Sequence, residues 1–471
     1  MTTTSLRIAT AFSALLLASS PAAAQQTARP AETPEVTAPA GDPKTGKKTE
    51  EKKEEETTDI KILKERQITM QHFRPVDRRG INMFETPKEP GVEYTGFKVD
   101  WNAAFTSQVQ SLDHSNAAVP VVVNGANTNQ LADIGFGFNN STANLYLNAQ
   151  LAKGIRVALT SYLSSRHHNE TWVKDGYILV DASPLDIKPL NKLMEYVTLR
   201  VGHFEINYGD AHFRRTDNGN AIYNAFVGNY IMDAFTTEIG GEAYFRHKGF
   251  LAMASITGGE LRGTVLTPEQ RGPTFIGKLG FDRQVKPNLR VRLTGSMYRT
   301  DKSISNTLYG GDRAGSRYYY VLENSAATES AQFTSGNINP GFKNSVSAFQ
   351  VNPFVKLGGL EVFGVLERSD GKAASETIER RFNQQAIDVV YRGLGDYVFV
   401  GGRYNRVKGR LSGFTNDVEA NRWQAAAGIF LTSGILMKAE YVTQEFKGYP
   451  VTHIRNGGKF HGMIFEGVVA F

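Results

Sequence analysis

Residues 96–471 alternate almost throughout between apolar and polar side chains, and short groups of turn residues separate the runs. In the first run Phe97 and Val99 share one face, whereas Lys98 and Asp100 share the other. A period of two residues is that of a β-strand, because successive side chains of a strand point to opposite faces. No convincing helical period lies between the runs, so the pattern predicts an all-β protein.

Counting these runs predicts about sixteen strands, each with ends uncertain by a few residues. They are expected near residues 96–112, 131–152, 155–167, 171–182, 194–208, 236–246, 250–258, 272–283, 288–301, 344–357, 360–370, 381–392, 396–408, 420–431, 435–446 and 458–471. The connections alternate in length, from two residues at Lys153-Gly154 to long stretches such as residues 209–235 and 302–343. Such alternation is typical of an antiparallel barrel with short periplasmic turns and long extracellular loops.

The two faces of the strands indicate the surroundings of this barrel. One face carries Leu, Val, Phe and Ala in strand after strand, and the other carries guanidinium and carboxylate groups. Sixteen strands enclose more space than side chains can fill, so an aliphatic interior would be left empty. We therefore predict a transmembrane barrel with aliphatic side chains against lipid and charged ones around a water-filled interior. A closed barrel leaves no unpaired backbone edge in hydrocarbon.

The last residue supports closure of the barrel. The final run alternates up to Phe471, where most chains end in polar residues. We interpret this run as a last strand that pairs with the first one, with the ring of Phe471 in the interfacial aromatic girdle.

The N-terminal residues have a different composition. Arg7, an apolar stretch and the small residues up to Ala24 have the order of a secretory signal peptide, predicted as residues 1–24. A retained membrane anchor is the alternative. Residues 25–66 are rich in Pro, Lys and Glu and contain no aromatic residue, which favours a disordered periplasmic linker. Attachment to a cell-wall or periplasmic partner is the alternative there. The predicted location is the bacterial outer membrane.

Residues 67–95 lie between the linker and the barrel and lack strand alternation. They contain three arginines, Arg74, Arg78 and Arg79. These residues are predicted either to form a strap along the periplasmic rim or to enter the periplasmic mouth as a partial plug. The barrel itself is assigned to residues 96–471.

Three stretches resemble a known family: Ser161 to Tyr177, Leu199 to Asp210, and the closing stretches LMKAEYVTQEF and GKFHGMIFEGVVAF. With the signal peptide, the even strand count and the terminal Phe, they are similar to Gram-negative outer-membrane porins of the phosphate-selective O/P type. The resemblance implies a sixteen-stranded channel, often a homotrimer, with a lumenal loop and basic residues that pass anions. The chain departs from that pattern in its charged N-terminal region and in having no continuous arginine ladder.

The third long loop is the expected constriction, because in this family that loop folds into the barrel. It would bring His212, Arg214, Arg215 and Asp217 to the path of solutes, where fixed charges select the sign of a permeating ion. The alternative is a loop over the outer mouth, with its charges in solvent or against lipopolysaccharide.

Alternation also predicts which charged residues line the channel wall. Both signs occur, so cross-strand pairs would cancel much of the field, and the sequence favours a mild anion preference at most. An ordinary salt-bridged wall is the alternative. His203 and Glu205 fall on the apolar phase of the strand that carries Arg200, so we expect a bulge there. The predicted lining residues are Lys98, Asp100, Arg156, Arg200, Glu238, Glu242, Arg290, Arg292, Asp388, Arg403, Lys438 and Glu440.

Composition narrows the functional classes. The chain has no cysteine, which excludes disulfides and thiolate metal sites, and its net charge of +6 is too diluted to indicate a nucleic-acid partner. No catalytic residue, metal site or cofactor is predicted: an outer-membrane hydrolase could use His203 and Glu205, but no serine is singled out. The sequence thus predicts a non-enzymatic porin for small hydrophilic or anionic solutes, surrounded by outer-membrane lipid and lipopolysaccharide. The alternative is a plugged barrel that links the outer membrane to the periplasm.

Overall fold

The computed structural model describes residues 70, 73–86, 94–166, 170–185, 187–311, 313, 315–329 and 334–471, all within one compact unit. The predicted signal peptide (residues 1–24) and linker (residues 25–66) lie outside the described residues. So do parts of residues 67–95.

Sixteen long strands form one antiparallel sheet in the described part of the chain, together with the two-residue strand β4 (Gly137–Phe138). The long strands are β1 (Lys98–Ser115), β5 (Thr142–Ala152), β6 (Ile155–Leu163), β7 (Trp172–Val180), β8 (Val197–Glu205), β9 (Thr237–His247), β10 (Phe250–Thr257), β11 (Thr274–Lys286), β12 (Leu289–Thr300), β13 (Ser345–Leu357), β14 (Leu360–Lys372), β15 (Arg380–Gly393), β16 (Val398–Gly409), β17 (Val418–Thr432), β18 (Ile435–Lys447) and β19 (Lys459–Ala470). A separate hairpin pairs β2 (Val122–Val123) with β3 (Ala126–Asn127).

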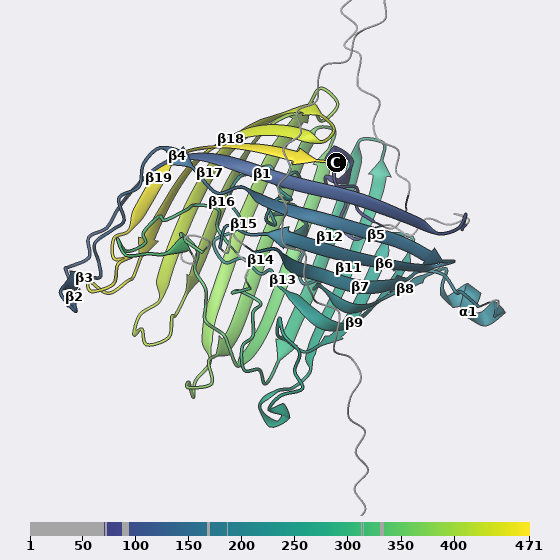
Figure 1. The fold of residues 1–471 in the computed structure, drawn as a ribbon, viewed down its shortest axis with the longest axis horizontal. Coiled ribbons are helices and arrows are strands. Elements are labelled where there is room, and N and C mark those ends of the chain that lie inside the picture. Colours follow the sequence, from purple (N-terminus) through teal and green to yellow (C-terminus); the bar gives the residue numbers. More distant parts are fainter. Residues whose placement is uncertain are drawn as a thin grey trace, which may run out of the picture. The chain divides into compact units, whose positions relative to one another are not determined.

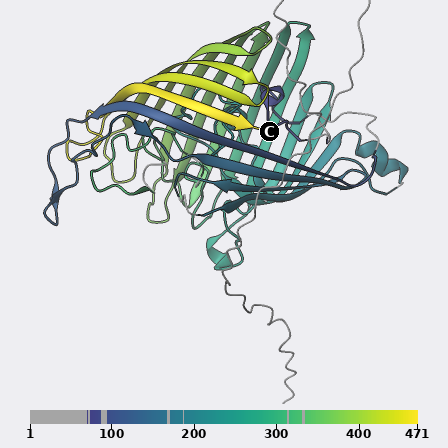
Figure 2. The ribbon, with the colours of Figure 1, turned by 45° about the horizontal axis from the view of Figure 1, so that its top comes forward.

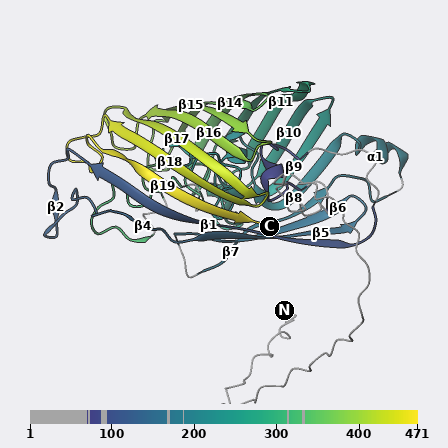
Figure 3. The ribbon, with the colours of Figure 1, turned by 90° about the horizontal axis from the view of Figure 1, so that it is seen from above.

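The sheet closes on itself because the last strand pairs with the first. β19 runs antiparallel to β1 from Ala104↔Ala470 to Ser115↔Lys459, and the yellow strand lies beside the blue one in Figures 1 and 3. The main-chain N–H of Phe471 donates to the carbonyl of Ala103 at 2.9 Å. The prediction of an all-β, closed, sixteen-stranded antiparallel barrel is confirmed, and Phe471 is hydrogen-bonded beside the closing strand pair.

The two ends of the barrel differ in the length of their connections. At the short-turn end most neighbouring strands are joined by two to four residues, as at Lys248-Gly249, where both φ angles are positive (47° and 91°). A two-residue hairpin turn of this kind requires that backbone. The connection of residues 181–196 is longer and contains α1 (Lys188–Leu193), which begins with a proline in its first turn. The opposite, long-loop end carries residues 206–236, 258–273 and 301–344 between strands.

Within the described residues, short 3₁₀ turns occur at three places, none of them in the wall of the barrel. They are η1 (Arg78–Gly80), η2 (Ala211–Arg214) and η3 (Pro268–Gln270). In the described residues no helix is both long and apolar enough to cross a membrane.

The strand faces divide as the alternation predicts. On the outer face Leu145, Leu293 and Trp101 are 48%, 53% and 57% exposed, whereas their neighbours Asn144 and Thr294 point inward and are at most 2% exposed. A one-residue change of register would exchange the two faces, so the alternation fixes how each strand pairs.

Two expectations about individual strands differ from the structure. The strand predicted from residue 131 begins at Thr142, because residues 131–141, with two glycines and two asparagines, form a loop in which only β4 pairs with β1. The bulge expected in β8 lies instead in β7, where the register steps from Asp175 to Val173 and leaves Lys174 as the extra residue. The bulge lets both Lys174 and Asp175 be buried in the interior.

Candidate functional site

The loop after β8, residues 206–236 (the inner loop), folds into the barrel and crosses to the opposite wall. Main-chain N–H groups of Val227 and Ile231 donate to Glu440 Oε2 (2.8 Å) and Asn405 Oδ1 (2.7 Å). The hydroxyl of Tyr230 donates to Asp388 Oδ2 at 3.0 Å. Polar side chains of β16 and β18 thus satisfy buried backbone groups of a segment that is not part of any sheet, and Asp388 of β15 holds one of its tyrosines.

The inner loop also satisfies much of its own backbone, which explains its asparagine-rich sequence. Asn224 Oδ1 accepts from the main-chain N–H of Phe226 at 3.0 Å, and Asn229 Oδ1 accepts from that of Thr216 at 2.8 Å. Asparagine side chains replace strand or helix hydrogen bonds in such turns.

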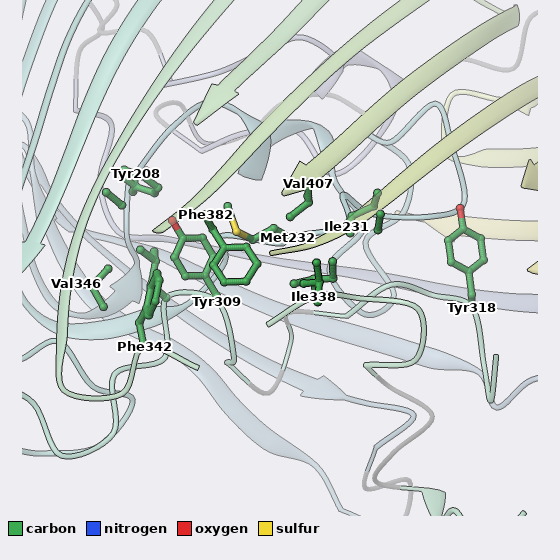
Figure 4. Close-up of a cluster of buried hydrophobic side chains, with 14 of the residues drawn as sticks. Tyr208, Ile231, Met232, Tyr309, Tyr318, Ile338, Phe342, Val346, Phe382 and Val407 are labelled. Atoms are coloured by element: carbon green, nitrogen blue, oxygen red, sulfur yellow. The ribbon is translucent and has the colours of Figure 1, made fainter. Parts of the chain in front are cut away.

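A second long connection, residues 301–344, also contributes side chains to the interior. Tyr309 and Tyr318 donate hydrogen bonds to Glu367 (2.7 Å) and Glu440 (2.7 Å) on the wall. Figure 4 shows these two tyrosines in one hydrophobic cluster with Ile231 and Met232 of the inner loop. The interior of the barrel is therefore largely packed, with two loops filling space that sixteen strands leave open.

The four residues predicted for the constriction lie in or beside η2 of the inner loop and are buried. His212 contacts Glu205, and Arg214 contacts Asn82 and Glu361. Arg215 forms a two-pronged ion pair with Asp233, at 2.9 and 2.5 Å. Asp217 pairs with Lys174. Each charge therefore has a partner inside the barrel, and a role of these residues at a constriction stays a prediction.

The residues predicted to line the wall all lie on the inward phase of their strands. Most of their charges are paired there: Arg403 with Asp388 (2.6 Å), Arg292 with Asp210 (2.8 Å), Lys438 with Glu466 (2.8 Å) and Arg290 with Asp282 (2.6 Å) are examples. Arg156 pairs with Asp181 and Arg200 with Glu242, while Lys98 and Asp100 are half-buried near the short-turn end. A wall of paired charges produces a weak net field.

Sequence reasoning missed several interior charges. Arg422 on β17, Lys278 on β11 and Glu361 on β14 are each at most 1% exposed and point inward. The same alternation that identified Arg403 places these three on the inward phase, so the signal was present. Glu85, in contrast, precedes the first strand, and no periodic pattern marks it.

A polar cavity of about 250 Å³ remains between the inner loop, the wall formed by β5–β9, and residues 73–86 (the N-terminal segment). Positively charged Arg74, Lys174, Arg200, Arg215 and Arg246 line it together with Glu85, Asp175, Glu205, Asp217, His212 and several tyrosines. Its lining is dense in charge of both signs.

The N-terminal segment lies inside the ring of strands and is the short purple stretch in Figure 2. Arg74 lines the cavity, and its guanidinium carbon lies 3.4 Å from the centre of the Tyr223 ring. Burial lowers the pKa of Arg74 to about 10. Arg78 contacts the turn at Gly395 (2.5 Å), and Arg79 pairs with Asp77 (2.5 Å).

The residues considered for catalysis or metal binding do not form one site. The ring of His203 hydrogen-bonds to Thr237 at 2.9 Å, whereas Glu205 contacts Lys174 and His212. In the described residues no group of three or more His, Asp or Glu side chains could hold a metal ion. Part of the Arg166 to Glu170 stretch, residues 167–169, lies outside the described residues.

No protein-family model matches the chain, and neither does any curated protein. The resemblance to porins of the phosphate-selective O/P type therefore stays a prediction. Among solved structures the chain is similar to the anion-selective porin from Comamonas acidovorans (TM-score 0.50, 13% identity, 80% of this chain and 100% of that one). It also aligns with OmpT of Vibrio cholerae (0.47, 9%, 81% and 99%) and with Salmonella typhi OmpF in complex with daunomycin (0.45, 11%, 80% and 98%). The fold is that of a porin-like closed barrel of sixteen antiparallel strands.

Proposed function

We propose that this protein is an outer-membrane channel through which small hydrophilic solutes diffuse. The observation that carries the proposal is the division of the closed barrel into an apolar outer face and a charged inner face. Leu293 is 53% exposed on the outside, while Arg292 beside it is 3% exposed on the inside. Lipid around the outer face would remove its apolar side chains from water, as in outer-membrane barrels.

The proposal places the protein in the bacterial outer membrane and gives each region of the chain a role there. Residues 1–24 would direct export, residues 25–66 would link into the periplasm, and residues 67–95 would lie at the periplasmic mouth. One solved OmpT of Vibrio cholerae is a trimer form, and a trimer of this chain belongs to the same proposal.

Solute passage would run along the cavity between the inner loop and β5–β9. Its lining carries five arginine and lysine side chains against four carboxylates, Glu85, Asp175, Glu205 and Asp217. This small excess supports a mild preference for anions, because fixed charges in a narrow passage set the sign of the ion that enters.

Planar-bilayer recording of the purified protein tests the channel. We expect stepwise current. In a KCl gradient, the zero-current potential should show that chloride permeates slightly better than potassium. Arg74→Gln should shift that potential in the direction of lower chloride and higher potassium permeability, since Arg74 lines the cavity with a positive charge. Arg299→Gln is the matched control, because that side chain is 59% exposed and on the outer phase of β12. Absence of steps would contradict the proposal, and cation selectivity of the unmodified protein would contradict its anion preference.

The dense packing of the interior favours a second candidate, a plugged barrel that anchors the envelope. Two loops and the N-terminal segment fill much of the interior, and Arg403 and Arg422 are at most 2% exposed. In this case deletion of residues 25–66 would release the barrel from the periplasmic layer during envelope fractionation, and no variant would carry current. Current from the full chain with unchanged fractionation would exclude this candidate.

A further inference from the structure

Glu85 of the N-terminal segment occupies a buried cationic site on the barrel wall. Its carboxylate lies 3.0 Å from Lys278 Nζ and 2.7 Å from a terminal nitrogen of Arg292, and it accepts from Asn207 Nδ2 at 3.1 Å. The Glu85 side chain is 4% exposed, and those of Lys278 and Arg292 are 0% and 2% exposed. Charge-assisted hydrogen bonds of this kind are among the stronger polar contacts in proteins.

The rest of this site belongs to the barrel and its inner loop. Lys278 and Arg292 point inward from the paired strands β11 and β12. Asp210 of the inner loop holds both cations, at 2.7 Å from Lys278 and 2.8 Å from Arg292. The hydroxyl of Thr294 donates to Asp210 at 2.7 Å. The cation pair thus has one carboxylate partner in the inner loop, Asp210, while the second carboxylate comes from a separate segment.

An aromatic ring is bound beside this carboxylate. The ring of Phe84 packs edge-on against Phe213 (5.8 Å) and Phe354 (5.3 Å). The guanidinium carbon of Arg292 lies 4.3 Å from the centre of the Phe84 ring, within the range of a cation–π contact. Arg292 therefore recognises a carboxylate and an aromatic ring at the same time.

The N-terminal segment is attached to the rest of the described chain mainly through side chains. Between residues 73–86 and the rest of the described chain there is a single main-chain to main-chain hydrogen bond, from Arg78 N to Ser433 O (2.8 Å). The remaining attachments are side-chain contacts, such as that of Asn82 with Glu361 (2.5 Å). Glu85 borders the polar cavity, and the cation pair lies behind it.

We propose that the site formed by Lys278, Arg292 and the surrounding phenylalanines binds aromatic carboxylates from the cavity, and that Phe84 and Glu85 are a tethered occupant of it. This inference rests on the proposed channel function and names a solute class for it. A tethered occupant competes with a free ligand, because the ligand binds only to the fraction of molecules whose site is vacant. Weakening the tether should therefore raise the apparent affinity for the free ligand.

Calorimetric titration of the purified full-length protein with 3-phenylpropionate tests this competition. Glu85→Gln removes the charge of the tethered occupant, and we expect it to lower the apparent Kd about tenfold relative to the unmodified protein. Asn82→Ala, which removes a different attachment of the same segment, should shift the Kd in the same direction. Glu195→Gln is the control, since this exposed carboxylate in the connection after β7 lies outside the site and should leave the Kd unchanged.

Ligand variation tests the two halves of the site. Acetate lacks the ring and 3-phenylpropionamide lacks the charge, so each should bind Glu85→Gln about tenfold or more weakly than 3-phenylpropionate. Equal Kd values for Glu85→Gln and the unmodified protein, or equal binding of acetate and 3-phenylpropionate, would overturn the proposal. Because binding is measured without current, an inactive channel that binds refutes only the channel function, whereas a conducting channel that does not bind refutes only this site.

Discussion

Arg403 on β16 and Asp388 on β15 lie directly opposite each other inside the barrel, with Nε 2.6 Å from Oδ1 and a terminal nitrogen 2.8 Å from Oδ2. Both side chains are 1% exposed. Asp388 also accepts a hydrogen bond from the hydroxyl of Tyr230, so the ion pair connects the wall to the inner loop.

Asp388→Asn should lower the free energy of unfolding by about 3–5 kcal/mol, because it leaves the buried Arg403 guanidinium without a counter-charge. Denaturant unfolding in detergent or lipid vesicles measures the loss. Asp370→Asn is the matched control: Asp370 is 21% exposed and pairs with Arg381 and Arg368, both 54% exposed, so its loss should cost no more than about 1 kcal/mol. Equal losses of stability for both variants would show that the cost of removing the carboxylate charge does not depend on its burial.

Lys438→Met should weaken the attachment of the inner loop to β18, where Glu440 also holds the loop. The Lys438 ammonium donates to the carbonyls of Ala221 (3.1 Å), Asn224 (3.0 Å) and Phe226 (2.8 Å) of that loop. Methionine has a similar shape but no donor, so these carbonyls and the buried carboxylate of Glu466 lose a partner. We expect larger and noisier current steps in planar bilayers if the inner loop limits the passage. Steps of unchanged size from a folded Lys438→Met barrel would show that it does not.

Gly80→Ala should loosen the N-terminal segment. A Cβ atom at this position would lie 2.2 Å from the carbonyl oxygen of Pro75 and 2.7 Å from the ring of Tyr223, so the backbone must move. We expect faster proteolysis within residues 73–86 and a larger conductance, with the heat stability of the barrel little changed. If the variant matches the unmodified protein in both measurements, the segment does not depend on this close approach.

Leu293→Lys tests whether lipid surrounds the barrel. Leu293 lies near the middle of β12 on the outer face, and a lysine there should cost about 2–4 kcal/mol when the barrel unfolds from lipid vesicles. Ile378→Lys is the control, because Ile378 is 78% exposed in the loop between β14 and β15. Similar stabilities of the two variants in lipid would place the outer face of β12 in water.

The loop around Glu376 should respond to acid. Hydrogen bonds from Arg380 lower the pKa of Glu376 from 4.5 to about 2, with further donors in Ala373 and Ser412. A carboxylate with a lowered pKa stabilises the fold above its unfolded pKa, and that contribution disappears as the pH falls from about 4.5 toward 2. Amide exchange in residues 373–379 should therefore accelerate over this range. Glu376→Gln should remove most of the pH dependence, and an unchanged response would assign it to another group.

Local alternation along the chain is sufficient to predict the barrel. Strand alternation is local, since a period of two requires only neighbouring residues, and it placed sixteen strands and the inward phase of residues such as Arg403 and Lys438. It failed where no period exists, as in residues 131–141, whose asparagines and glycines form a loop before β5.

The contents of the barrel depend on contacts between segments that are far apart in the chain. Asn82 and Glu361 are 279 residues apart in the chain but hydrogen-bond in the interior, and Glu85 reaches Lys278 and Arg292 from a segment without any periodic pattern. Such contacts depend on the closed shape of the sheet, which brings segments far apart in the chain next to one another. The chemistry of the interior therefore arises from long-range packing, whereas the wall arises from local alternation.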